Sequence, residues 1–142
     1  MSNVVRTVSI SHEAALRTVS TGIEVAADHG IAACITVMDP ALGMVAMGRA
    51  DGTTPHSVET SRRKATTAAS TRRPTGWMQG DFALALPLGT GNQLTNIKGG
   101  FPIFFDGEFV GGLGVAGGPP EKDAEIAVEV LKAIGADEVA AS

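Results

Sequence analysis

Aromatic residues are scarce in this chain of 142 residues. It has no tyrosine and one tryptophan, and aromatic residues make up 4% of the sequence. Proteins that bind single-stranded nucleic acids stack bases on aromatic side chains and hold phosphates with basic surfaces. This chain instead carries a formal net charge of −4. We therefore expect no nucleic-acid partner.

Cysteine and long apolar runs are nearly absent as well. Cys34 is the only cysteine, which excludes an internal disulfide, and its apolar neighbours indicate a buried, unreactive thiol. No apolar run approaches the ~20 residues of a membrane-spanning helix. The first residues lack the basic-then-apolar pattern of a secretory signal. We expect no membrane partner and a cytoplasmic location.

Metal-binding spacings are missing too. The three histidines form no His-x-x-His pair, and a single cysteine cannot form a Cys-x-x-Cys pair. These spacings are typical of preformed zinc sites. The sequence therefore predicts no metal site.

Glycine is abundant, and it gathers late in the chain. Ten of the 18 glycines lie between positions 89 and 118. Asp106-Gly107 separates two apolar runs, Phe101–Phe105 and Phe109–Ala116. An Asp-Gly pair between apolar runs favours a tight hairpin turn, because both central residues need positive φ. The sequence predicts a β-hairpin here.

The run Phe109–Ala116 contains glycines, which weaken a β-strand. Gly112 and Gly114 cost strand stability and indicate that a helix, a ligand or another subunit lies against the backbone. Gly117 precedes a predicted acidic helix, and exposed backbone N–H groups there are typical of an anion-binding nest. These three glycines are candidate ligand-binding positions.

The remaining patterns predict helices around a second hairpin. Ser11 caps a helix that stops at Gly30, and an Asp-Pro turn joins two apolar strands. Helices packed on hairpins define the α+β class rather than a parallel, nucleotide-binding sheet. We expect one domain over residues 1–142. The expected elements are strands 31–38 and 44–49, helices 57–72 and 121–134, a short helix over 77–86 and a loop over 87–97.

Several segments together resemble a known family. They are Val37-Met38-Asp39, Gly48-Arg49-Ala50-Asp51-Gly52, Ser61-Arg62-Arg63-Lys64-Ala65-Thr66-Thr67-Ala68, Gly99-Gly100-Phe101-Pro102-Ile103, Asp106-Gly107, the run from Val110 to Gly117, and Asp123 to Ala127. With this pattern the chain resembles the GlcG/HbpS-like family, which includes the C-terminal domain of PduO-type proteins. The resemblance covers nearly the whole chain.

The resemblance implies a profilin-like layered domain with a five-stranded antiparallel sheet and helices on its faces. It implies self-association into dimers, tetramers or octamers. It also implies haem as the possible cofactor, since some members resemble haem-binding or haem-degrading proteins.

His56 and Lys64 are the candidate catalytic residues. His56 lies between a strand and a basic helix, and histidine is a common ligand of haem iron and a common general base. The alternative is a solvent-exposed side chain near a helix start. Lys64 precedes a run of small residues, which indicates close packing. Burial there would lower the pKa of the Lys64 amine and suit it to acid–base work.

Arg49 and Arg63 are candidate ligand-binding residues. The planar guanidinium fork suits haem propionates, a carboxylate or a phosphate. The alternative is a solvated basic face that pairs with nearby acids such as Glu59.

Three functions are compatible with these residues. The first is a haem-binding or haem-handling protein, which the resemblance favours. The second is a metal-independent enzyme acting on a small carboxylate-bearing metabolite in a pocket at a subunit interface. The third is a non-catalytic oligomeric accessory module.

Overall fold

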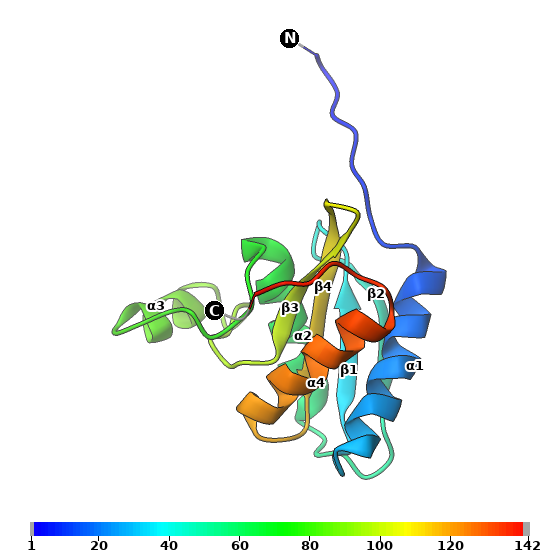
Figure 1. Cartoon of the computed structure of the whole chain (residues 1–142). Coiled ribbons are helices and arrows are strands. Elements are labelled where there is room, and N and C mark those ends of the chain that lie inside the picture. Colours follow the sequence, from blue (N-terminus) through cyan, green and yellow to red (C-terminus); the bar gives the residue numbers. More distant parts are fainter. Residues whose placement is uncertain (1, 141–142) are drawn as a thin grey trace.

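A four-stranded antiparallel sheet forms the centre of the structure, a computed structural model that describes residues 2–140 (Figure 1). Its strands are β1 (Cys34–Met38), β2 (Met44–Arg49), β3 (Gly100–Phe105) and β4 (Glu108–Ala116). Their order across the sheet is β2-β1-β4-β3, and all three pairings are antiparallel. The two predicted hairpins are therefore joined through β1 and β4.

The expectation of five strands is wrong for the described residues, which form four. Residues 31–33, expected as the start of a strand, are not part of β1. On the outer side of β3, loop residues bind the strand where a further strand would pair. Thr75 N donates to Gly100 O at 2.9 Å, and Asp137 N donates to Phe104 O at 2.8 Å.

The helices cover both faces of the sheet (Figure 1). The helix α1 (His12–Asp28) packs on β1 and β2 and against α4 (Pro120–Ala133), and α2 (Ser57–Thr71) lies on the opposite face over β4, β1 and β3. Ser11 caps α1 as predicted, because its side chain accepts a hydrogen bond from Ala14 N at 3.1 Å. None of the helices in residues 2–140 is long and apolar enough to cross a bilayer.

The short helix α3 (Phe82–Gly89) begins later and runs further than the predicted 77–86. Gly80 has a φ of 60°, which prevents the helix from starting at Trp77. The helix then continues through Pro87, since Thr90 N still reaches Leu86 O at 3.1 Å. None of the residues of α3 is buried, and the segment projects from the body of the molecule (Figure 1).

The glycines of β4 bring α2 unusually close to the sheet. A Cβ atom on Gly112 would overlap the carbonyl oxygen of Ala65, and one on Gly114 would overlap that of Ser61. The backbone of α2 therefore rests directly on β4. Of the three explanations that the sequence left open for these two glycines, the structure supports the helix.

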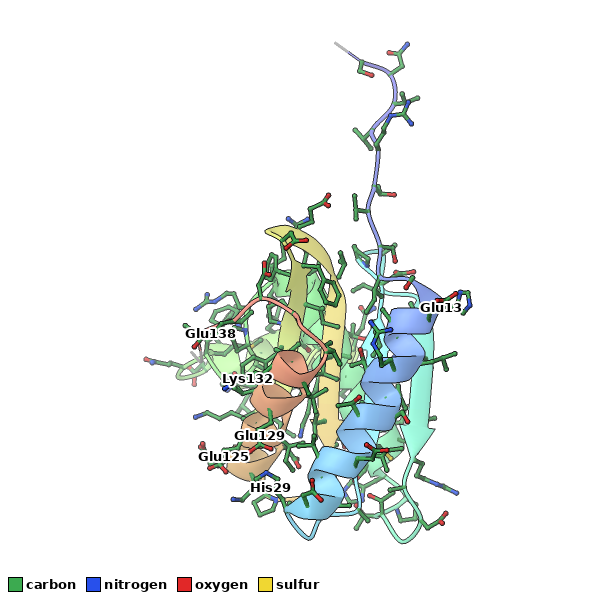
Figure 2. The ribbon with its side chains drawn as sticks, turned by 45° about the vertical axis from the view of Figure 1, so that its right-hand side comes forward. Glu13, His29, Glu125, Glu129, Lys132 and Glu138 are labelled. Carbon is green, nitrogen blue, oxygen red and sulfur yellow. The ribbon has the colours of Figure 1, made fainter. Side chains whose placement is uncertain are left out.

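The opposite face carries the main core. Apolar side chains from α1, α4 and all four strands form one buried cluster there. A hydrogen bond adds a surface link between the two helices, because His29 Nε2 at the end of α1 lies 3.0 Å from Glu129 Oε2 on α4 (Figure 2). Burial of the cluster holds α1 and α4 on the sheet.

Candidate functional site

A hollow of about 300 Å³ lies where the start of α2 meets the start of α4. The segment before α2 and its first turns contribute Thr54, His56 and Thr60. The loop before β3 contributes Ile97, and the end of β4 contributes Gly117. Three residues singled out in the sequence, His56, Lys64 and Gly117, line this hollow, and it is our candidate functional site.

The Lys64 side chain ends in this hollow as half of a buried ion pair. Its Nζ atom lies 3.0 Å from Asp123 Oδ2 and donates to Val115 O at 2.8 Å. The side chains of Lys64 and Asp123 are each 1% exposed. Asp123 is also held by its neighbours, since Gly118 N donates to Oδ1 at 3.0 Å. Both charged groups are therefore partnered inside the protein.

Burial governs the protonation of this pair. It lowers the pKa of the Lys64 amine, and the Asp123 carboxylate acts against that change. It likewise raises the pKa of the Asp123 carboxyl group, which the Lys64 charge opposes. The small neighbours of Lys64 in the sequence predicted a lowered pKa for its amine, and the burial seen in the structure acts in the same direction.

Gly99 makes room for the ammonium group. Its φ is 125°, in the region that favours glycine, and a Cβ there would lie 2.8 Å from Lys64 Nζ and 2.6 Å from Val115 O. Any side chain at this position would collide with the ion pair.

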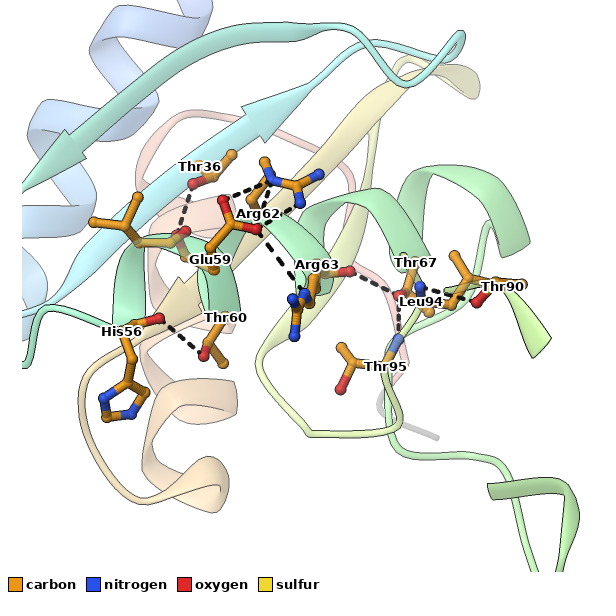
Figure 3. A network of polar contacts seen from close by, with 12 residues as sticks. Thr36, His56, Glu59, Thr60, Arg62, Arg63, Thr67, Thr90, Leu94 and Thr95 are labelled. Atoms are coloured by element: carbon orange, nitrogen blue, oxygen red, sulfur yellow. Dashed lines mark hydrogen bonds and ion pairs between the residues drawn. The ribbon is translucent and has the colours of Figure 1, made fainter. Parts of the chain in front are cut away.

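His56 stands at the rim of the hollow, at the N-cap of α2. Its carbonyl oxygen accepts a hydrogen bond from Thr60 Oγ1 at 3.2 Å (Figure 3). The residue is exposed, and within residues 2–140 its imidazole has no hydrogen-bond partner. Both ring nitrogens are therefore free to meet a ligand.

The two candidate ligand-binding arginines, Arg49 and Arg63, do not line the hollow. Arg49 is exposed at the end of β2. Arg63 lies on α2 with its Nε atom 4.0 Å from Glu59 Oε2, and Arg62 Nη2 approaches the same oxygen to 2.6 Å (Figure 3). Both Arg62 and Arg63 therefore pair with Glu59, which is the acid named in the alternative interpretation above.

The candidate glycines divide in the same way. Gly117 lines the hollow with a φ of 138°, whereas Gly112 and Gly114 are covered by α2. Gly114 therefore cannot share a pocket with Lys64 and Arg49, because the α2 backbone occupies the space over Gly114.

Sequence reasoning missed the pairing of Asp123 with Lys64. Asp123 lies in the first turn of α4, where an acidic side chain suits the helix start, and it accepts the hydrogen bond from Gly118 N. The available signal was Lys64 itself, because a lysine among small buried residues needs an internal counter-charge. Among the described residues, no group of three or more metal-ligating side chains is found.

Comparison with known proteins identifies the family of this chain. Residues 10–132 match the sequence model of a family described as "Haem degrading protein HbpS-like", and the chain belongs to this HbpS-like family. It is similar to protein GlcG of Escherichia coli, with 31% identity over 110 residues that cover 77% of this chain and 82% of GlcG.

Solved structures share the fold. Crystalline HbpS superposes with a TM-score of 0.81 at 29% identity, covering 93% of this chain and 94% of HbpS. A PduOC:haem complex superposes with a TM-score of 0.84, covering 94% of this chain and all (100%) of that one. Klebsiella pneumoniae protein ORFY reaches 0.87 and covers 97% and 99%. The last two are 24% identical to this chain and show the fold alone.

Proposed function

We propose that this protein binds or processes haem at the hollow beside His56. The proposal is carried by one observation: an exposed histidine without a hydrogen-bond partner stands on the rim of a hollow, in a chain of the HbpS-like family. Imidazole is a common axial ligand of haem iron. The PduOC structure was solved with haem, and HbpS gives the family its name.

The residues around the hollow fit such a ligand in two respects. His56 offers a nitrogen to the iron, while Ile97, Ala116 and Pro120 supply apolar surface. When bound, haem would supply a redox-active iron. The residues of this chain would bind the haem, and the buried Lys64–Asp123 pair would keep α2 and α4 in place on either side of the hollow.

A hemin titration tests this function. Wild-type protein is expected to shift the Soret band of hemin, and His56→Ala is expected to abolish the shift or weaken binding at least tenfold, since the iron loses its protein ligand. His12→Ala is the matched control, because His12 is also exposed but lies at the start of α1. An unchanged wild-type spectrum, or equal affinity in His56→Ala, would contradict the proposal.

A small carboxylate is the second candidate ligand. The hollow places His56 near two titratable groups whose pKa values burial displaces, as in many acid–base sites. Metal-independent chemistry on a carboxylate-bearing metabolite would use these groups. Thermal-shift measurements with acetate and succinate, in the absence of hemin, separate this function from the first.

We further propose that the chain self-associates through α3. Phe82, Leu84 and Leu88 are 46%, 69% and 70% exposed, and residues 82–97 contain no charged side chain. Exposed apolar surface of this kind marks an interaction site, and charge is depleted at the centre of protein interfaces. A second copy is the partner that the HbpS-like fold favours.

Light scattering tests this interface. The wild-type chain is expected to exceed its monomer mass of 14.5 kDa, and the Leu84→Glu/Leu88→Glu double variant is expected to have a lower mass than the wild type at the same concentration. Leu16→Glu is the control, because Leu16 on α1 is 58% exposed outside the α3 segment. Equal masses for the wild type and the double variant would contradict the assignment of α3.

A further inference from the structure

Residues 2–9 have the sequence of a β-strand, but none of the strands that the structure describes pairs with them. Val4, Val5 and Val8 are 71%, 87% and 46% exposed. β-branched residues favour strands. The segment runs away from the body in both views, and it joins the body at Ile10, whose N–H donates to Val110 O at 3.0 Å (Figures 1 and 2). Its backbone is extended and solvated.

The two edges of the sheet differ in whether they can accept another strand. At β3 the edge is closed. Thr75 and Asp137 bind its outer carbonyl groups, Gly100 N donates to Thr75 Oγ1 at 3.0 Å, and Pro102 has no N–H to offer. A further strand has few backbone groups to bind there.

The edge at β2 is open. Ala50 N donates to Ala33 O at 3.0 Å, so this opposed pair is of the hydrogen-bonded kind. In an antiparallel ladder such pairs alternate with pairs that do not, and Arg49 opposite Cys34 is of the second kind. Met47, opposite Thr36, is also of the second kind. The N–H and C=O groups of Met47 and Arg49 therefore face outward, and no hydrogen bond within residues 2–140 uses them.

The composition of β2 leaves this edge unprotected. Sheet edges are usually shielded by charged side chains, by proline or by a covering loop. Of the six residues of β2, none is proline and Arg49 at its end carries the single charge, while Met44 and Met47 are 48% and 38% exposed. The lengths also match, because residues 3–9 span about 23 Å and the six residues of β2 about 20 Å in extended conformation.

We propose that residues 3–9 of one copy add as a further strand to the outer edge of β2 in a second copy. Strand addition satisfies backbone groups on both partners and needs no matching side-chain pockets for its main affinity. The contact joins two copies, because the segment leaves the body of its own copy at Ile10, which binds Val110, and points away from its own sheet (Figure 1). This interface uses neither the hollow nor α3, and it goes beyond the functions proposed above.

Two complementary variants test the contact. In Met47→Pro, the ring removes an outward N–H and leaves the β1–β2 ladder its own hydrogen bonds, so the edge is blocked while the N-terminal segment stays. Deletion of residues 2–8 removes the segment and keeps the edge. Amide hydrogen exchange of residues 3–9, followed by NMR on labelled protein without hemin, is the readout.

In the wild type we expect exchange at these amides to slow at least tenfold as the protein concentration rises. In labelled Met47→Pro alone the exchange should stay fast, and adding the unlabelled deletion variant should slow it again. Exchange that is fast in the wild type at all concentrations, slow in Met47→Pro alone, or unchanged by the deletion variant would overturn the proposal. Arg49→Pro, which blocks the same edge, replaces Met47→Pro if the latter does not fold.

Discussion

Replacing Lys64 by methionine is expected to lower the free energy of unfolding by about 3–5 kcal/mol, because it leaves the Asp123 carboxylate buried without its counter-charge. For a chain of this size, such a loss corresponds to a fall in melting temperature of roughly 10 °C or more. Urea denaturation and thermal melting measure both quantities.

The Lys98→Met variant is the matched control. Lys98 Nζ lies 3.1 Å from Glu121 Oε1, nearly the same separation, but these side chains are 36% and 77% exposed. An exposed pair contributes about 0–1 kcal/mol, so the same substitution should have little effect there. Similar losses for both variants would show that burial does not set the strength of the Lys64–Asp123 pair.

A double variant separates charge from packing. In Lys64→Met/Asp123→Asn, no buried charge remains, and the asparagine oxygen can still accept the hydrogen bond from Gly118 N. We expect this variant to regain more than half of the stability that Lys64→Met loses. A loss equal to or larger than that of the single variant would indicate that packing around the lysine stem dominates.

Replacing Gly114 by alanine is expected to cost about 3 kcal/mol, and replacing it by valine to prevent folding. The new Cβ would overlap Ser61 O and lie 2.7 Å from Ala65 N. Both are backbone atoms of α2, so no side-chain rotation can relieve the clash, and the helix must move off the sheet. Thermal melting followed by circular dichroism measures the effect.

Gly89→Ala is the control for this substitution. Nothing lies within 4 Å of a Cβ placed on Gly89, and its φ is outside the region that disfavours side chains. We expect its stability to stay within about 0.5 kcal/mol of the wild type. Equal stability of Gly114→Ala and wild type would show that α2 can lift from β4 at little cost.

The local elements were predictable because their signals are local. Ser11 caps α1, and the Asp106-Gly107 turn joins β3 to β4 with positive φ at both residues, as the sequence indicates. The family resemblance was correct, whereas the fifth strand that it implied is absent from residues 2–140. The number of strands in a sheet depends on what covers its edges, and Thr75 and Asp137 gave no sign of that role.

The site was predictable only in part, because it is assembled from distant segments. His56, Lys64 and Gly117 line the hollow. Arg49 and Arg63 do not, and Arg63 lies beside Glu59 instead. The pairing of Lys64 with Asp123 was not predicted, because 59 positions separate the two residues in the sequence. Side-chain convergence is a tertiary property that spacing along one chain does not encode.

The backbone contact between α2 and β4 limits how this protein can vary. At Gly112 and Gly114 the backbone of α2 meets the backbone of β4, so no change of side chain there can shift the helix, which carries Lys64 and begins next to His56. Homologues that prefer another ligand are thus expected to differ in the three connecting segments around the hollow, which are residues 50–56, 95–99 and 117–119. The sequence of β4 should vary little among these homologues, whereas the three connecting segments should vary more.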